Sequence, residues 1–150
     1  MKKNKLVVFF TLIAVFFLTS CGGYTSLNSP SVSTSTVAPN FFVTVADKTT
    51  AHPYFGMGSM GFVINGVQGP AITLTRGTTY VFSVNAPGHL FFITTSAVGG
   101  STAGMVNTGV TANNISSGIL TFTPDATHPS LLYYQCSIHS YMGWEINIVD

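Results

Sequence analysis

Charged side chains are scarce in this sequence. Only 6% of the 150 residues are Asp, Glu, Lys or Arg, and three of the five basic residues, Lys2, Lys3 and Lys5, stand at the start of the chain. No basic run follows them, so binding to nucleic acid has no electrostatic support. A surface made mostly of Ser, Thr, Asn and Gly also predicts weak long-range charge steering toward a partner.

Sustained helical periodicity is also absent. Short runs of apolar and polar residues alternate instead, between turns of Gly, Pro and Asn, which is typical of strands. About seven or eight such runs predict an all-β fold, a Greek-key β-sandwich or barrel. The expected strands are residues 41–45, 62–64, 72–75, 79–84, 90–95, 118–123, 131–135 and 144–149.

Residues 1–20 have the pattern of an export signal. A positive start is followed by an apolar run from Leu6 to Leu18, which is too short to span a bilayer. The small residues directly before Cys21 resemble the bacterial lipobox, which implies cleavage there and acylation of the Cys21 thiol. An ordinary signal peptide with an incidental cysteine is the alternative. We expect an exported bacterial lipoprotein, held on a membrane by its acyl chains and facing the periplasm or the cell surface.

The remainder of the chain divides into a tether and one domain. Residues 21–40 are rich in Ser, Thr, Asn and Pro and hold few large apolar residues, so they cannot offset the entropy cost of ordering. We interpret them as a flexible tether. Residues 41–150 have the length of a single domain with one hydrophobic core, and we expect a monomer.

Cysteine is the next scarce residue, with two in the whole chain. If Cys21 is acylated, Cys136 has no partner for an intramolecular disulfide in an oxidising compartment. A buried thiol that packs as a small hydrophobe is one explanation for Cys136. A thiol bound to a metal ion is the other.

The residues around Cys136 favour the metal. His139 and Met142 follow it at steps of three, in a loop between two expected strands. Thiolate, imidazole and thioether together suit copper in both of its oxidation states. His89, directly after the Pro87–Gly88 turn, is placed to supply a second imidazole if two strand ends meet at one end of a sandwich.

Two stretches of the sequence match a known family. The loop from Cys136 to Met142 has the shortest ligand-loop spacing of the cupredoxins, that of amicyanin, and Gly88–His89 matches their first histidine. In these motifs and in the strand pattern of residues 41–150 the chain resembles the cupredoxins, the family of plastocyanin, azurin and pseudoazurin. The resemblance implies a β-sandwich with one type 1 copper ion bound by His89, Cys136, His139 and an axial Met142, and a role in moving single electrons.

The sequence departs from the cupredoxin pattern at two positions. Leu90 stands where many members have an Asn that pins the cysteine loop, and Ile138 stands where many have Pro. Unlike proline, Ile138 has an amide hydrogen, so it could donate a second N–H to the Cys136 sulfur. Such a bond withdraws electron density from the thiolate and should favour the reduced state.

The resemblance also implies a brief encounter with a redox partner protein, through an uncharged patch of Pro87, Leu90 and Tyr141 around His139. Two other functions stay open: copper storage or delivery, and a surface binding module of the same fold whose site is non-redox or empty. We expect no enzyme. The chain lacks the His-x-His pairs of multicopper oxidases and the second loop cysteine of the two-copper site in terminal oxidases, and no carboxylate adjoins a candidate base.

The other histidines give weaker signals. His52 shares a glycine-rich loop with Met57 and Met60, which either forms a second copper site or packs near the end of the sandwich. His128 precedes a proline in a turn, and we expect it to be exposed to solvent. The aromatic residues that flank the ligand loop are expected to pack and to shield it: Tyr133, Tyr134, Tyr141 and Trp144.

Overall fold

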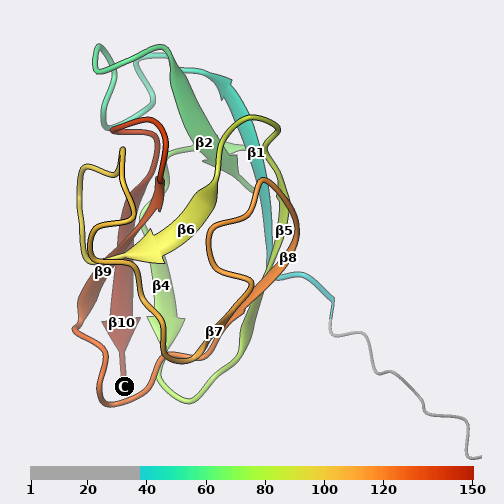
Figure 1. Ribbon diagram of the computed structural model, residues 1–150, viewed down its shortest axis with the longest axis vertical. Helices are drawn as coiled ribbons and strands as arrows, with labels where there is room; N and C mark the ends of the chain where they lie inside the picture. The colour runs from blue at the N-terminus through green and yellow to red at the C-terminus, as the bar shows by residue number, and fades with distance from the viewer. Residues whose placement is uncertain (1–37) are drawn as a thin grey trace, which may run out of the picture. The chain divides into compact units, whose positions relative to one another are not determined.

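The computed structural model describes residues 38–150 and contains ten strands and no helix in that part of the chain (Figure 1). The predicted all-β class is confirmed. Eight strands have four or more residues, which matches the predicted number, and two strands of two residues add to them. The strands are β1 (Phe41–Asp47), β2 (Met60–Ile64), β3 (Val67–Gln68), β4 (Ile72–Thr75), β5 (Tyr80–Asn85), β6 (Phe91–Thr94), β7 (Val110–Thr111), β8 (Ser117–Phe122), β9 (Leu131–Cys136) and β10 (Trp144–Val149).

The strands form the two sheets of a β-sandwich. The larger sheet has the order β3-β2-β1-β5-β8-β7, and the smaller has the order β4-β10-β9-β6. Most neighbours are antiparallel, but β1 runs parallel to β5 and β10 runs parallel to β4. The chain passes from one sheet to the other repeatedly, so residues distant in sequence meet at the ends of the sandwich (Figure 1).

One hydrophobic core fills the space between the sheets. Alternation decides which side chains enter it: in β4, Ile72 and Leu74 are buried and the two threonines are exposed. Aromatic rings make up much of the core, as in the edge-on contact of Phe62 with Phe91, whose centroids are 5.1 Å apart. Tyr134 is fully buried there, and burial raises the pKa of its hydroxyl, which donates to the Pro70 carbonyl at 2.8 Å.

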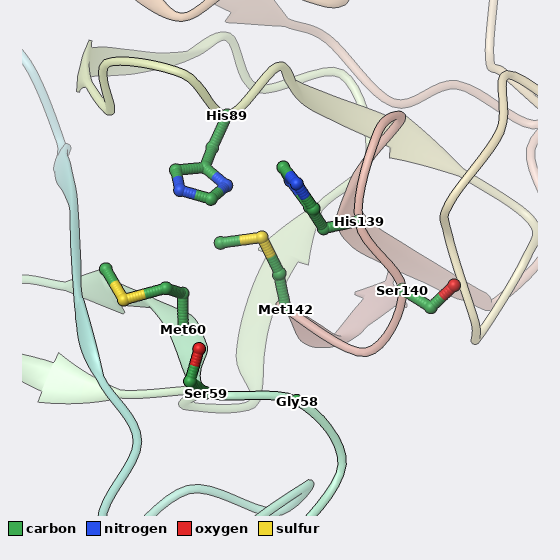
Figure 2. A pocket seen from close by; sticks show the side chains of 7 residues that line it. All are labelled: Gly58, Ser59, Met60, His89, His139, Ser140 and Met142. Carbon is green, nitrogen blue, oxygen red and sulfur yellow. The ribbon is translucent and has the colours of Figure 1, made fainter.

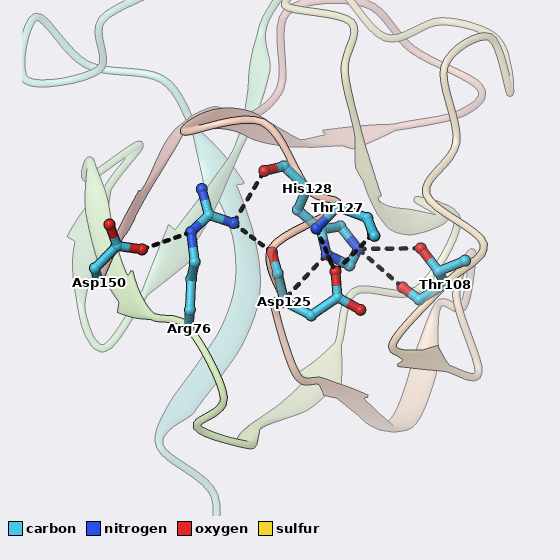
Figure 3. Close-up of polar contacts among 6 residues, drawn as sticks. All are labelled: Arg76, Thr108, Asp125, Thr127, His128 and Asp150. Carbon is cyan, nitrogen blue, oxygen red and sulfur yellow. Dashed lines mark hydrogen bonds and ion pairs between the residues drawn. The ribbon is translucent and has the colours of Figure 1, made fainter.

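His128 lies in a polar cluster before β9, and its predicted exposure is wrong (Figure 3). Its side chain is buried, with Nδ1 2.9 Å from Asp125 Oδ1 and Nε2 3.1 Å from the Thr108 carbonyl oxygen. The loop that carries Thr108 covers the ring, a long-range contact that no local pattern announces. Hydrogen bonds from the Thr127 hydroxyl and amide, and then from His128, lower the pKa of Asp125.

Arg76 joins the same cluster to the end of the chain. Its guanidinium donates to the carbonyl oxygens of Asp125 and His128 and, through Nε, to Asp150 Oδ1 at 3.0 Å (Figure 3). The His128 cluster lies before the first residue of β9, whereas Cys136 is the last residue of that strand. The cluster therefore lies at the opposite end of β9 from the predicted ligand loop.

The described chain begins within the predicted tether. Asn40 is already fixed, because its amide donates to the Val81 carbonyl at 2.9 Å and its side chain accepts from the Val81 amide at 2.8 Å. The predicted signal sequence and Cys21 lie outside the described residues. Within residues 38–150, no helix has the length and hydropathy needed to cross a membrane.

Gly143 ends the ligand loop and begins the approach to β10. Two properties of this position show why it holds a glycine. The φ angle of Gly143 is not in the left-handed region, and a Cβ atom there would overlap the backbone carbonyl of Tyr134 on β9. Glycine is therefore required because the two strands approach closely where the loop ends.

We expect Gly143→Ala to destabilise the full-length chain by about 3 kcal/mol or more, because backbone atoms must move to admit the methyl group. Gly77→Ala is the control. That glycine has φ 75° and open space around it, so only left-handed strain is added, about 1 kcal/mol. Guanidinium unfolding curves would compare the two variants, and equal losses would contradict the steric explanation.

Candidate metal centre

The pairing of β6 with β9 brings His89 to the cysteine loop. The two strands are antiparallel, and Phe91 at the start of β6 pairs with Cys136 at the end of β9. Next to this pair, just outside both strands, the Ser137 amide donates to the Leu90 carbonyl at 3.1 Å. His89, two residues before β6, therefore lies beside the end of β9 at which Cys136 stands, at one end of the smaller sheet.

Three side chains form a group that could hold a metal ion. The ligand atoms of His89, Cys136 and His139 all lie within 4.8 Å of one another. The two imidazole rings are tilted by 53°, with centroids 4.8 Å apart. Exposure differs across the group: the cysteine is buried, His89 is half-buried and His139 is exposed. The imidazole of His139 is thus open to solvent, and the thiol of Cys136 is shielded from solvent.

Met142 completes the set of four residues predicted from the sequence. Its side chain is 1% exposed, and Figure 2 shows the thioether directed between the two imidazole rings. Met142 and both histidines line a hollow of about 240 Å³ together with Gly58, Ser59, Met60 and Ser140. The structure thus gathers an imidazole pair, a thiol and a thioether at one place.

His89 has a property that a metal ion would explain. Its Nδ1 is buried and, among the described residues, has no hydrogen-bond partner. Buried polar atoms are nearly always paired, so an open ring nitrogen beside a thiol is a gap in the hydrogen bonding. Burial, and then the neighbouring imidazole of His139, lower the pKa of His89 and favour the neutral ring. A neutral imidazole is the form that binds a metal ion.

The Cys136 sulfur accepts two backbone hydrogen bonds. The amides of Ile138 and His139 donate to it at 3.4 and 3.5 Å. The bond from Ile138 is the one predicted from the absence of proline at that position. Two N–H groups are thus directed at the atom that would bind a metal ion.

Asn114 holds the ligand loop, and the sequence analysis missed it. Its Oδ1 accepts from the Ser137 hydroxyl at 2.6 Å, and its backbone adopts the left-handed φ of 73°. With Leu90 in place of the Asn found in many cupredoxins, the loop is pinned by the Leu90 carbonyl and by Asn114 from a separate segment. The pair Asn113–Asn114 before β8 is typical of a turn, but nothing in this local pattern indicates the contact with Ser137.

The loop that precedes β2 contributes to the wall of the hollow. His52 is buried and both of its ring nitrogens are hydrogen-bonded, so it is not free to bind a metal ion. Met57 is 50% exposed and is not among the residues that line the hollow, whereas Met60 is. Of the two roles that we considered for this loop, packing is the one that fits His52. Besides Met142, the methionine that lines the hollow is Met60.

Comparisons with solved structures return rusticyanin. A structure of rusticyanin from Thiobacillus ferrooxidans aligns with 72% of this chain and 76% of that chain, at 18% identity and a TM-score of 0.42. Another structure, described as that of the copper protein rusticyanin, aligns over the same shares at 19% identity and a TM-score of 0.42. The fold described above is assigned from its own strand pairing.

Sequence comparisons return a short match and a long one. Protein Skeletor of Drosophila melanogaster, in isoforms B/C and in isoforms D/E, is 42% identical over 33 residues. This segment is 22% of the chain but only 4% and 2% of those much longer proteins. The model of the At5g54830-like domain matches residues 35–150, which include every strand described here. The chain therefore belongs to the At5g54830-like domain family.

Proposed function

We propose that this protein is a cupredoxin-like electron carrier, with one type 1 copper ion bound by His89, Cys136, His139 and Met142. The observation that carries the proposal is the unpartnered Nδ1 of His89, held beside the thiol and imidazole of a loop far away in the sequence. Two imidazoles, a thiolate and a weak thioether are the ligand set of blue-copper sites. Bound copper would supply a reversible one-electron couple.

The protein's own residues would keep that couple rigid. Strand pairing fixes His89 and Cys136, and the amides of Ile138 and His139 hold the sulfur. Met142 is enclosed, so its thioether cannot leave freely to solvent. Ligands that barely move between two charge states lower the reorganisation needed for electron transfer. On this proposal the protein is a carrier and not an enzyme.

The exposed edge of His139 would pass the electron to a partner. Around it we propose the uncharged patch of Pro87, Leu90 and Tyr141, to which Ile138 adds a side chain that is 53% exposed. No charged residue belongs to this patch, so a redox partner would meet it briefly over a small interface, as electron-transfer proteins commonly do. We propose that the carrier itself acts as a monomer.

The N-terminal pattern completes the proposal. Acylation of Cys21 would place the domain at a membrane surface, outside the cytoplasm, at the end of a Ser/Thr-rich tether. A tether of this composition gives the domain reach without fixing its orientation. An electron carrier that must present one end to its partner is served by that freedom.

Copper delivery is a second candidate, and Met60 is the observation that favours it. Its thioether lines the same hollow as Met142 and both histidines (Figure 2). Thioethers prefer the cuprous ion, and a hollow of about 240 Å³ is larger than the space that one ion fills. Met60 could therefore offer a second position for a cuprous ion that enters or leaves.

The visible spectrum tests whether Cys136 binds copper. We expect the full-length protein in detergent to bind one cupric ion per chain and to turn intensely blue, because a thiolate is a ligand. Cys136→Ser should lose the colour, and His128→Gln, at the other end of β9, should keep it. Absorption and electron paramagnetic resonance spectra would measure this. A wild-type protein that folds and stays colourless with copper would refute the proposed function.

The reduction potential tests the hydrogen bond from the Ile138 amide to the Cys136 sulfur. Ile138→Pro removes the amide that donates to Cys136 Sγ at 3.4 Å. The sulfur then donates more electron density, so we expect the potential to fall by tens of millivolts, equivalent to about 1 kcal/mol for one hydrogen bond. Ile138→Val keeps the amide and is the matched control in a redox titration. An unchanged or higher potential in the proline variant would contradict the role of this bond.

The affinity for the cuprous ion separates copper delivery from electron transfer. We expect Met60→Leu to weaken cuprous binding about tenfold, or about 1.4 kcal/mol, and to leave the cupric spectrum unchanged. Met57→Leu is the control, because that methionine is three residues earlier in the chain but outside the lining of the hollow. Competition with a cuprous chelator would measure both affinities. Equal affinities in the two variants would leave delivery without its supporting observation.

A further inference from the structure

His52 is a buried histidine whose tautomer follows from its two hydrogen-bond partners. It is 2% exposed, and its Nδ1 accepts a hydrogen bond from the Tyr54 amide at 3.0 Å. In a neutral ring, the proton must then be on Nε2. That nitrogen lies 3.1 Å from the backbone carbonyl oxygen of Met142, to which it donates. Burial is the main cause that lowers the pKa of His52, so the neutral ring is favoured.

Two glycines make room for this ring. A Cβ atom at Gly61 would lie 2.6 Å from the imidazole, and one at Gly69 would lie 2.9 Å from it. Both distances are too short for real atoms, so any larger residue at either position would push the ring away. Gly61 is part of β2, and Gly69 follows β3, so the ring is held against the edge of the larger sheet.

The peptide group between Met142 and Gly143 is held from both sheets. The Met142 carbonyl accepts from His52 and also from the Phe62 amide at 2.7 Å, both of which belong to the β1–β2 side. The Gly143 amide donates to the Gln135 side chain on β9 at 3.0 Å. The backbone of Met142 is thus fixed in position, and its side chain is directed between the two imidazole rings (Figure 2).

We propose that His52 is a positioning residue, which sets the place of the Met142 thioether through the Met142 carbonyl. The inference rests on the proposed function, because Met142 is an axial ligand only if copper is bound. It assigns a role to a histidine whose two nitrogens are occupied and which therefore binds no metal itself. Outer-shell partners of this kind typically change metal affinity 10–100-fold when they are lost.

Two polar substitutions in the full-length chain test this. In His52→Gln, the amide can accept from Tyr54 and still reach the Met142 carbonyl, so copper affinity and the electron paramagnetic resonance spectrum should stay close to those of the wild type. In His52→Asn, the shorter side chain can accept from Tyr54 but cannot reach Met142. We expect an altered spectrum, a shifted reduction potential and a 10–100-fold loss of copper affinity.

His128→Asn is the control for a merely structural effect. His128 is also buried and doubly hydrogen-bonded, but it lies at the other end of β9. It should lower the melting temperature and leave the copper spectrum unchanged. If His52→Asn and His52→Gln give the same spectrum and affinity, or if His128→Asn changes them equally, the positioning role is refuted.

A second measurement needs no variant. Nitrogen NMR of the copper-free chain with labelled histidine should show His52 as the Nε2–H tautomer, and an Nδ1–H tautomer would overturn the proposal.

Failure of the proposed function is distinguishable from failure of this inference. In the first case, the wild-type protein itself forms no blue site. In the second, it forms one that does not respond to the length of residue 52.

Discussion

The register between β6 and β9 is the constraint on which the candidate site depends. Phe91 pairs with Cys136, and this pairing places His89 opposite the loop that carries His139 and Met142. A shift of one residue would turn every side chain of β6 to the other face, and because all four are buried, each would have to pack against different neighbours. The same apolar packing that stabilises the sandwich therefore sets the distance between the two imidazoles.

Neutral hydrogen bonds, and not charges, hold the ligand loop. Asn114, Gln135 and His52 each hold one part of it through an uncharged side chain. The charged groups of the Arg76 cluster lie at the opposite end of β9 (Figure 3), whereas Lys48 donates to the Met57 carbonyl in the loop beside the hollow. The charges of the Arg76 cluster are therefore kept away from the sulfur of Cys136. If the site passes electrons as proposed, its charge changes by one unit, and distant ion pairs perturb that change less than adjacent ones would.

Local pattern predicted the strands well and placed Cys136, His139 and Met142 together between two of them. Alternation located strands such as β4 and β5, and the spacing of Cys136, His139 and Met142 depends only on neighbouring residues. What the sequence could not reveal are contacts between segments that are far apart. The burial of His128 depends on the loop that carries Thr108, and the bond of His52 to Met142 crosses 90 positions. No period or turn signal encodes such pairings, because they follow from the register of the sheets.

The exposure of the four side chains gives an argument for retention over release of a bound ion. Cys136 and Met142 are buried, and only His139 is exposed, so an ion held by all four would have one open edge. An acceptor protein would need to displace the thiolate from within the core, where two amides stabilise it. An electron needs no such displacement and can pass through the exposed imidazole. Met60 is the one wall residue that weakens this argument, because its thioether offers a departing cuprous ion a soft ligand beside the site.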